Sequence, residues 1–158
     1  MTAAGPGGNG DPGIEIAWVF DAPREQVWRE WTEPDRFADW YGAPTMEVPL
    51  DTVSMDVRVG GRWSLVMRGQ GREIHWDGEY LEVEPPERLV FTVTDRPDEE
   101  RYAVCTVVLR DAGEGRTEMR FTQSGALPPE MYRRTREGWS GFFSRIAERL
   151  ANDTGGAE

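Results

Sequence analysis

Lysine is absent from the 158-residue chain, and all 18 of its basic residues are arginine. Because a Schiff base or a P-loop phosphate site needs a lysine amine, the sequence excludes both kinds of chemistry. The chain has 29 acidic residues and a formal charge of -11 at pH 7. A surface of this sign repels phosphate backbones and anionic lipids, so we expect no nucleic-acid partner and no anionic membrane surface.

Cysteine and histidine occur once each, as Cys105 and His75. A single cysteine cannot form an intrachain disulfide. One residue of each type also excludes the multi-histidine and multi-cysteine sites that hold zinc. The acidic residues show no calcium-loop spacing, so we expect no metal and no other cofactor. Cys105 lies among valines, which is typical of a small buried side chain and not of a reactive thiol.

Long hydrophobic runs are missing as well. The longest, AVCTVVL, contains Thr106 and is far shorter than the roughly 18 residues of a membrane span. The first residues, MTAAGPGGNGDPG, lack the basic and apolar regions of a secretory signal. We therefore expect no membrane insertion and a cytoplasmic location.

The composition divides the chain into three parts. Residues 1–13 are rich in glycine and proline and predict a disordered tail. Residues 152–158 predict a second disordered tail. Residues 14–151 are expected to form a single domain, which suits their number.

The spacing of apolar residues changes in an ordered way along this domain. The stretch IEIAWVF (14–20) predicts a strand. Two short helices should follow, the first capped by Asp21 or Ala22 and the second capped by Thr32. Gly42 is expected to end the second helix.

The rest of the domain predicts strands and then one long helix. Turn signals separate several strand-like runs, which is typical of an antiparallel meander, and Pro49 interrupts the first run. From Pro128 to about Ala151 the apolar residues recur at helical spacing, in a stripe made of Trp139, Phe143, Ile146 and Leu150. The sequence therefore predicts an α+β fold in which a curved antiparallel sheet of about six to seven strands wraps around the long helix.

The order and spacing of several segments resemble a known superfamily. The segments are APREQVW (22–28), TEPDRFADWYG (32–42), DVRVGGRW (56–63), DGEYLEVEPPERLVFT (77–92), GRTEMRFTQSG (115–125) and EGWSGFFSRIAERL (137–150). Together they resemble the START and birch-pollen-allergen (SRPBCC) superfamily of helix-grip folds, and within it the activator-of-heat-shock-protein-ATPase homologue-like domains. One departure is Ala43, which stands before Pro44 where the family often has Gly-Pro.

This resemblance implies a cavity between the sheet and the long helix in many members, which bind lipids, hormones or aromatic polyketides or act as cyclases. Eukaryotic co-chaperones carry the domain behind a separate domain that contacts the chaperone. We expect no such preceding domain here, since 13 residues lie before Ile14. Fold resemblance alone does not fix the function.

Large rings and methionines are the candidate ligand-binding residues, because pockets are mostly apolar with few polar groups. Trp28 and Trp31 are expected to pack in the core, whereas the resemblance places Trp40 and Tyr41 at the cavity mouth. His75 is a candidate for a hydrogen bond to the ligand. The full candidate set is Trp40, Tyr41, Trp63, Met67, His75, Trp76, Tyr80, Phe91, Tyr102, Met119, Phe121, Trp139, Phe142 and Phe143. Which strand face looks inward stays open, because one bulge reverses the alternation.

Three functions remain open at this point. The first is binding of a hydrophobic or aromatic small molecule by a monomer or homodimer. The second is a cyclase- or hydrolase-like enzyme, whose acids and bases would come from Arg62, His75, Asp77, Tyr80 and Tyr102. The third is a chaperone partner or stress-response protein without a cavity ligand. We assign no catalytic residue.

The arginines of one hairpin leave a further alternative. Arg62, Arg68 and Arg72 cluster there. They either contact a carboxylate at the cavity rim or form solvated pairs with nearby acids.

Overall fold

The computed structural model describes residues 13–42, 46–95, 102–125 and 128–156. The sequence predicts disordered tails at residues 1–13 and 152–158. Residues 1–12 and 157–158 and the Ala43–Pro44 departure lie outside the described ranges, whereas residues 152–156 belong to the last helix instead of a tail. The elements follow in the order β1 (Ile14–Phe20), α1 (Arg24–Thr32), α2 (Pro34–Trp40), η1 (Leu50–Thr52), β2 (Ser54–Met55), β3 (Arg62–Gly69), β4 (Arg72–Glu84), β5 (Arg88–Val93), β6 (Ala103–Gly113), β7 (Arg116–Ser124), η2 (Pro129–Met131) and α3 (Tyr132–Gly156). The predicted order of strand, two short helices, further strands and a long helix is confirmed.

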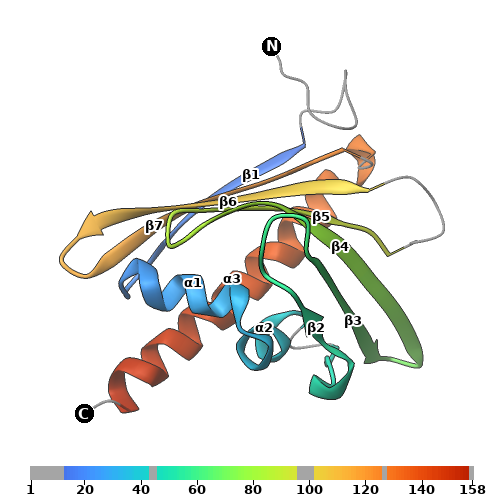
Figure 1. Cartoon of the computed structure of the whole chain (residues 1–158), viewed down its shortest axis with the longest axis horizontal. Helices are drawn as coiled ribbons and strands as arrows, with labels where there is room; N and C mark the ends of the chain where they lie inside the picture. The colour runs from blue at the N-terminus through green and yellow to red at the C-terminus, as the bar shows by residue number, and fades with distance from the viewer. Residues whose placement is uncertain (1–12, 43–45, 96–101, 126–127, 157–158) are drawn as a thin grey trace.

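Seven strands form one antiparallel sheet in the order β1-β7-β6-β5-β4-β3-β2. The first strand therefore pairs with the last, with Ile16 opposite Phe121. Figure 1 shows the three α-helices on the same side of the curved sheet, with α3 crossing beneath it. This arrangement confirms the predicted α+β helix-grip fold and defines an inner face of the sheet, toward the helices, and an outer face.

The sheet holds α3 through the predicted apolar stripe. Trp139, Phe143, Ile146 and Leu150 have exposed fractions of 6%, 0%, 0% and 2%. Burying an aromatic or branched side chain of this size stabilises the fold by about 1.5–3 kcal/mol. The helix ends at Gly156, beyond the expected end near Ala151. The stripe fixes which side of α3 faces the sheet.

The two short helices are joined by one extended residue. Glu33 ends α1 and precedes Pro34, the first residue of α2, with φ -99° and ψ 127°. A residue before proline avoids helical geometry, which explains the break between the helices. The helix caps differ from the prediction, since Pro23 precedes α1 and the Thr32 hydroxyl donates to the Trp28 carbonyl oxygen at 2.9 Å. Proline supplies the start of both helices in place of a side-chain cap.

A bulge in β4 changes which residues face inward. Up to Tyr80 the inner face carries Trp76, Gly78 and Tyr80 at alternate positions. The register shifts between Tyr80 and Glu82, and Val83 is the next residue packed against the core. Leu81, next to the bulge, is 38% exposed. The bulge thus reverses the alternation that the sequence alone leaves open.

Gly78 lies where two strands and an indole ring meet. The Trp63 indole donates a 3.0 Å hydrogen bond to the Thr92 carbonyl oxygen across the inner face. A Cβ atom at Gly78 would overlap both the Thr92 oxygen and the Trp63 nitrogen. Only a residue without a side chain leaves room for the Trp63 ring to reach across β4 to Thr92.

Both margins of the sheet have backbone groups that are already bonded. At one margin, Arg136 of α3 donates to the carbonyl oxygen of Glu15 in β1 at 2.6 Å. At the other, the amides of Val66 and Arg68 in β3 donate to Thr52 Oγ1 at 3.1 Å and to the Glu47 carbonyl oxygen at 2.8 Å. The predicted broken strand is therefore a bridge, the η1 turn and the two-residue strand β2.

Candidate functional site

Twelve of the fourteen candidate ligand-binding residues lie in or against one hydrophobic core between the sheet and the helices. Ten of them are buried: Trp40, Tyr41, Trp63, Met67, Tyr80, Phe91, Met119, Phe121, Trp139 and Phe143. Trp76 and Phe142 are half-buried. These twelve residues come from α2 and its C-terminal end, from α3, and from strands β3, β4, β5 and β7. We call them together the aromatic wall.

The other two candidates lie apart from this core. His75 alternates with Trp76 on β4, so its side chain is on the outer face, where its ring lies 3.3 Å from Glu73 Oε1. Tyr102 is 41% exposed and precedes β6. Neither side chain is placed to contact a molecule held between the sheet and α3.

Trp31 occupies the centre of the buried aromatic residues. Its ring lies within 4.9–6.4 Å of six others, which we call the Trp31 cluster: Phe37, Trp40, Phe91, Phe121, Trp139 and Phe143. Trp31 is 1% exposed. The sequence predicts it to pack in the core, and the burial confirms this. The dense ring contacts here indicate a filled interior around α1.

Tyr41 is the centre of a second group of rings. Its centroid lies within 4.9–6.3 Å of six others, which we call the Tyr41 cluster: Phe37, Trp40, Trp63, Trp76, Trp139 and Phe142. Burial raises the pKa of the Tyr41 hydroxyl well above its usual value, with further contributions from Cys105 and Asp95. Because Trp76 and Phe142 are half-buried, the Tyr41 cluster is the part of the aromatic wall that reaches solvent.

A few polar groups interrupt the apolar wall. Gln123 accepts a hydrogen bond from the Trp139 indole at 2.7 Å, and the Cys105 thiol lies 4.0 Å from the same Gln123 oxygen. Burial raises the pKa of this thiol. Within the described residues, the buried indole nitrogens of Trp31 and Trp76 have no hydrogen-bond partner. Buried donors are nearly always paired, so these two are exceptional.

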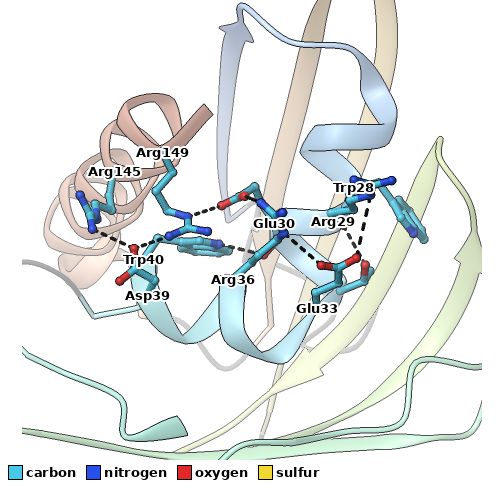
Figure 2. Close-up of polar contacts among 10 residues, drawn as sticks. Trp28, Arg29, Glu30, Glu33, Arg36, Asp39, Trp40, Arg145 and Arg149 are labelled. Atoms are coloured by element: carbon cyan, nitrogen blue, oxygen red, sulfur yellow. Dashed lines mark hydrogen bonds and ion pairs between the residues drawn. The ribbon is translucent and has the colours of Figure 1, made fainter. Parts of the chain in front are cut away.

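A charged cluster fastens the short helices to α3, as Figure 2 shows. The fully buried carboxylate of Glu30 lies 2.7 Å from Arg149 Nε and 3.1 Å from Arg36 Nη1. Arg149 also bonds Asp39, which in turn lies 2.8 Å from Arg145. We call these five residues the Glu30 clamp. It joins α1, α2 and α3, so it fixes the position of Trp40 and Tyr41 at the end of α2.

Two opposing effects act on the pKa values of Asp39 and Arg149 in the Glu30 clamp. Burial by itself raises the pKa of Asp39, but hydrogen bonds and charge from Arg149 and Arg145 outweigh it, and the net pKa is lowered. Burial lowers the pKa of Arg149, whereas its bonds to Glu30 and Asp39 raise it overall. Asp39 and Arg149 therefore each favour the charged form of the other. The Trp40 indole adds a 2.8 Å hydrogen bond to the Glu30 carbonyl oxygen.

The predicted acids and bases do not converge on the inner face. Arg62 and Asp77 form an ion pair at 2.7 Å with exposed side-chain fractions of 63% and 28%. Of the five candidates, Tyr80 alone is buried, and burial raises its pKa above the usual value.

In the described ranges, no three His, Cys, Asp or Glu side chains are grouped so that they could hold a metal ion. None of the described helices is long and apolar enough to cross a membrane.

The sequence model of the "Activator of Hsp90 ATPase homolog 1-like protein" family matches residues 21–151. The chain belongs to this family. The residues that match the family model include both short helices, strands β2 to β7 and most of α3. Family membership and the helix-grip fold support a ligand-binding domain in general terms, and the family description also suggests interaction with a chaperone.

Solved structures share the fold of this family member. A crystal structure of a protein from Chromobacterium violaceum is 26% identical, with a TM-score of 0.76 over 87% of this chain and 95% of that chain. The AHSA1 protein from Silicibacter pomeroyi is 23% identical, with a TM-score of 0.74 over 89% and 99% of the two chains. CalU16 from Micromonospora echinospora is 24% identical, with a TM-score of 0.66 over 98% and 90%. No curated protein sequence matches this chain.

Two features of the site were missed at the level of sequence. Trp31 and Phe37 were not among the candidates, although both lie at the centre of the ring contacts. Their helical spacing marks them as core residues, but it does not show which rings they meet. The Glu30 clamp has no local signal, because Glu30 and Arg149 are 119 positions apart.

Proposed function

We propose that this protein binds an apolar, aromatic small molecule against the Tyr41 cluster, between the inner face of the sheet and α3. The observation that carries the proposal is the position of Trp76 and Phe142. Both rings contact Tyr41, at 6.0 Å and 5.2 Å, and both are half-buried. A molecule arriving from solvent therefore meets these two rings first and the buried wall behind them.

The chemistry of the wall favours such a ligand. Its side chains are mainly aromatic, and binding sites of this kind use a large apolar lining with a few polar groups to orient the ligand. Removing about 200 Å² of apolar ligand surface from water contributes roughly 5 kcal/mol before the costs of association. Ring-on-ring contacts add about 0.5–1.5 kcal/mol for each well-oriented pair.

The lack of convergent acids and bases supports binding without catalysis. His75, Asp77 and Arg62 lie on the outer face of the sheet, and the Arg62–Asp77 pair is already formed. General acid–base catalysis needs a titratable group within hydrogen-bond reach of the substrate. We therefore favour binding over the cyclase-like or hydrolase-like alternative.

Titration with a panel of flavones, fluorenes and polycyclic aromatic hydrocarbons tests the proposal. Trp76 and Trp139 are in the Tyr41 cluster, so binding should change tryptophan fluorescence and raise the melting temperature. Phe142→Ser should weaken binding at least tenfold, about 1.4 kcal/mol, because it removes a ring from the cluster. Val19→Ser is the control, since Val19 is 54% exposed on the outer face of β1. A panel that leaves both readouts of the unmutated protein unchanged would refute the proposal.

A further inference from the structure

The indole N–H of Trp76 is a buried donor without an acceptor among the described residues. Trp76 follows the inner-face alternation of β4, and its ring contacts Tyr41 at 6.0 Å. Because an indole nitrogen can only donate, no rotation of a hydrogen atom relieves the missing bond. Leaving such a group buried and unpaired destabilises the protein, because its bond to water is lost without replacement. A molecule that supplies an acceptor at this position would recover that free energy.

Other indoles in the same wall are already bonded. Trp40, Trp63 and Trp139 donate to oxygens at 2.8 Å, 3.0 Å and 2.7 Å. Trp31 also lacks an acceptor, but it is 1% exposed and its ring is surrounded by the Trp31 cluster. The Trp76 residue is half-buried although its Nε1 atom is buried, so of the two residues with an unpaired donor it is the one whose side chain extends to solvent.

None of the arginines in the described ranges is fully buried. The buried polar or charged side chains among all described residues are Glu30, Thr117 and Gln123, and none of them is a cation at neutral pH. Each half-buried arginine pairs with a carboxylate: Arg24 with Glu87, Arg36 with Glu30, Arg88 with Glu82, Arg145 with Asp39, and Arg149 with Glu30 and Asp39. On the outer face, Arg62 and Arg68 pair with Asp77 and Glu73. A carboxylate ligand would therefore lose its hydration without gaining a counter-ion.

From these observations we propose that the bound molecule is uncharged and carries a carbonyl-type acceptor that receives the Trp76 N–H. This inference rests on the proposed binding function and names the ligand class within it. The aromatic body of the ligand packs on Tyr41 and Phe142, and its carbonyl oxygen lies within hydrogen-bond reach of Trp76 Nε1. The donor selects among aromatic molecules of similar size and shape, and the lack of a buried arginine within the described residues selects against their acids.

Three matched probes test this inference: fluorene, 9-fluorenone and 9-fluorenone-2-carboxylate. Their dissociation constants are measured by protein fluorescence and checked by the shift in melting temperature at pH 7. We expect 9-fluorenone to bind about tenfold more tightly than fluorene, because it satisfies the buried donor. The carboxylate should bind at least tenfold more weakly than 9-fluorenone.

Trp76→Phe keeps an aromatic ring and removes the N–H. In this variant we expect 9-fluorenone to lose about tenfold more affinity than fluorene loses, because only 9-fluorenone uses the N–H. Fluorene is thus the internal control for folding and packing. Equal binding of fluorene and 9-fluorenone to the unmutated protein would overturn the inference and leave the proposed function standing. An equal loss of affinity for both probes in Trp76→Phe would also overturn it, because Trp76 would then act through packing alone. If neither the probes nor the wider aromatic panel binds, the proposed function fails as well.

Discussion

Replacing Arg149 with methionine is expected to destabilise the protein strongly, although Arg149 is not in the hydrophobic core. Its guanidinium lies 2.7 Å from Glu30 Oε1 and also bonds Asp39. Methionine keeps much of the side-chain length but removes the charge and the donors. Asp39 keeps Arg145 at 2.8 Å, whereas the fully buried Glu30 keeps only Arg36 at 3.1 Å among the partners described above.

The size of the effect follows from the burial of Glu30. Removing one partner of a buried ion pair typically costs about 3–5 kcal/mol, because the other charge stays buried. Arg36 remains as a second partner, so we expect the lower end, about 3 kcal/mol. In a domain of this size that corresponds to a fall of about 6–12 °C in melting temperature.

Glu30→Met should be milder. After this substitution Arg149 still has Asp39, and Arg36 still has Glu33 at 3.0 Å, so no charge is left buried and unpaired. We expect a loss of about 1 kcal/mol. Adding Glu30→Met to Arg149→Met should then restore about 2 kcal/mol, since the double variant no longer buries an unpaired carboxylate.

Equilibrium unfolding in guanidinium chloride, followed by circular dichroism, measures all four proteins of this double-mutant cycle. Equal costs for the two single variants, or a coupling energy near zero, would refute the reasoning. The Glu30 clamp would then contribute no net unfolding free energy, because water would replace its contacts equally well.

Three further predictions concern other parts of the fold. Gly78→Ala should cost about 1–3 kcal/mol in unfolding free energy, because its methyl group overlaps the Thr92 carbonyl oxygen, whereas Gly138→Ala has open space on α3 and should stabilise the helix by up to about 1 kcal/mol. Asp39 has a lowered pKa in the folded state, so its contribution to the unfolding free energy should be present above about pH 4 and vanish as the pH falls through that lowered value. The difference in unfolding free energy between the unmutated protein and Asp39→Asn, measured by denaturation from about pH 6 to pH 2.5, should therefore shrink on acidification. Cys105 is 0% exposed and burial raises its pKa, so a thiol reagent should label it at the rate of unfolding; rapid labelling under native conditions would contradict the buried position.

The spacing of apolar residues was sufficient to predict the arrangement of the fold. The i, i+4, i+7, i+11 stripe from Trp139 to Leu150 places the sheet-facing side of α3, and that side is buried as expected. Turn signals separated the strands, although the region around Pro49 forms a 3-10 turn and a very short strand. These features depend on neighbours in sequence, which is why local patterns reveal them.

The candidate site was harder to predict because it depends on register and on distant pairs. His75 and Trp76 are adjacent in sequence but face opposite sides of β4, and no local pattern assigns the inner side to Trp76. The bulge after Tyr80 then changes which alternate positions of β4 face inward. The pairing of Glu30 with Arg149 arises only when α3 docks against the short helices. A charge pattern in the sequence cannot show which of 18 arginines will supply that partner.

The bonded margins of the sheet have a consequence for self-association. A strand from another molecule needs a row of free amide and carbonyl groups on which to add. On β1 the guanidinium of Arg136 occupies the Glu15 oxygen, and on β3 Thr52 and Glu47 occupy alternate amides. Strand addition at these positions would first have to break hydrogen bonds within the protein. This cost disfavours edge-to-edge polymerisation through β1 or β3 and favours association through side chains on the faces of the molecule.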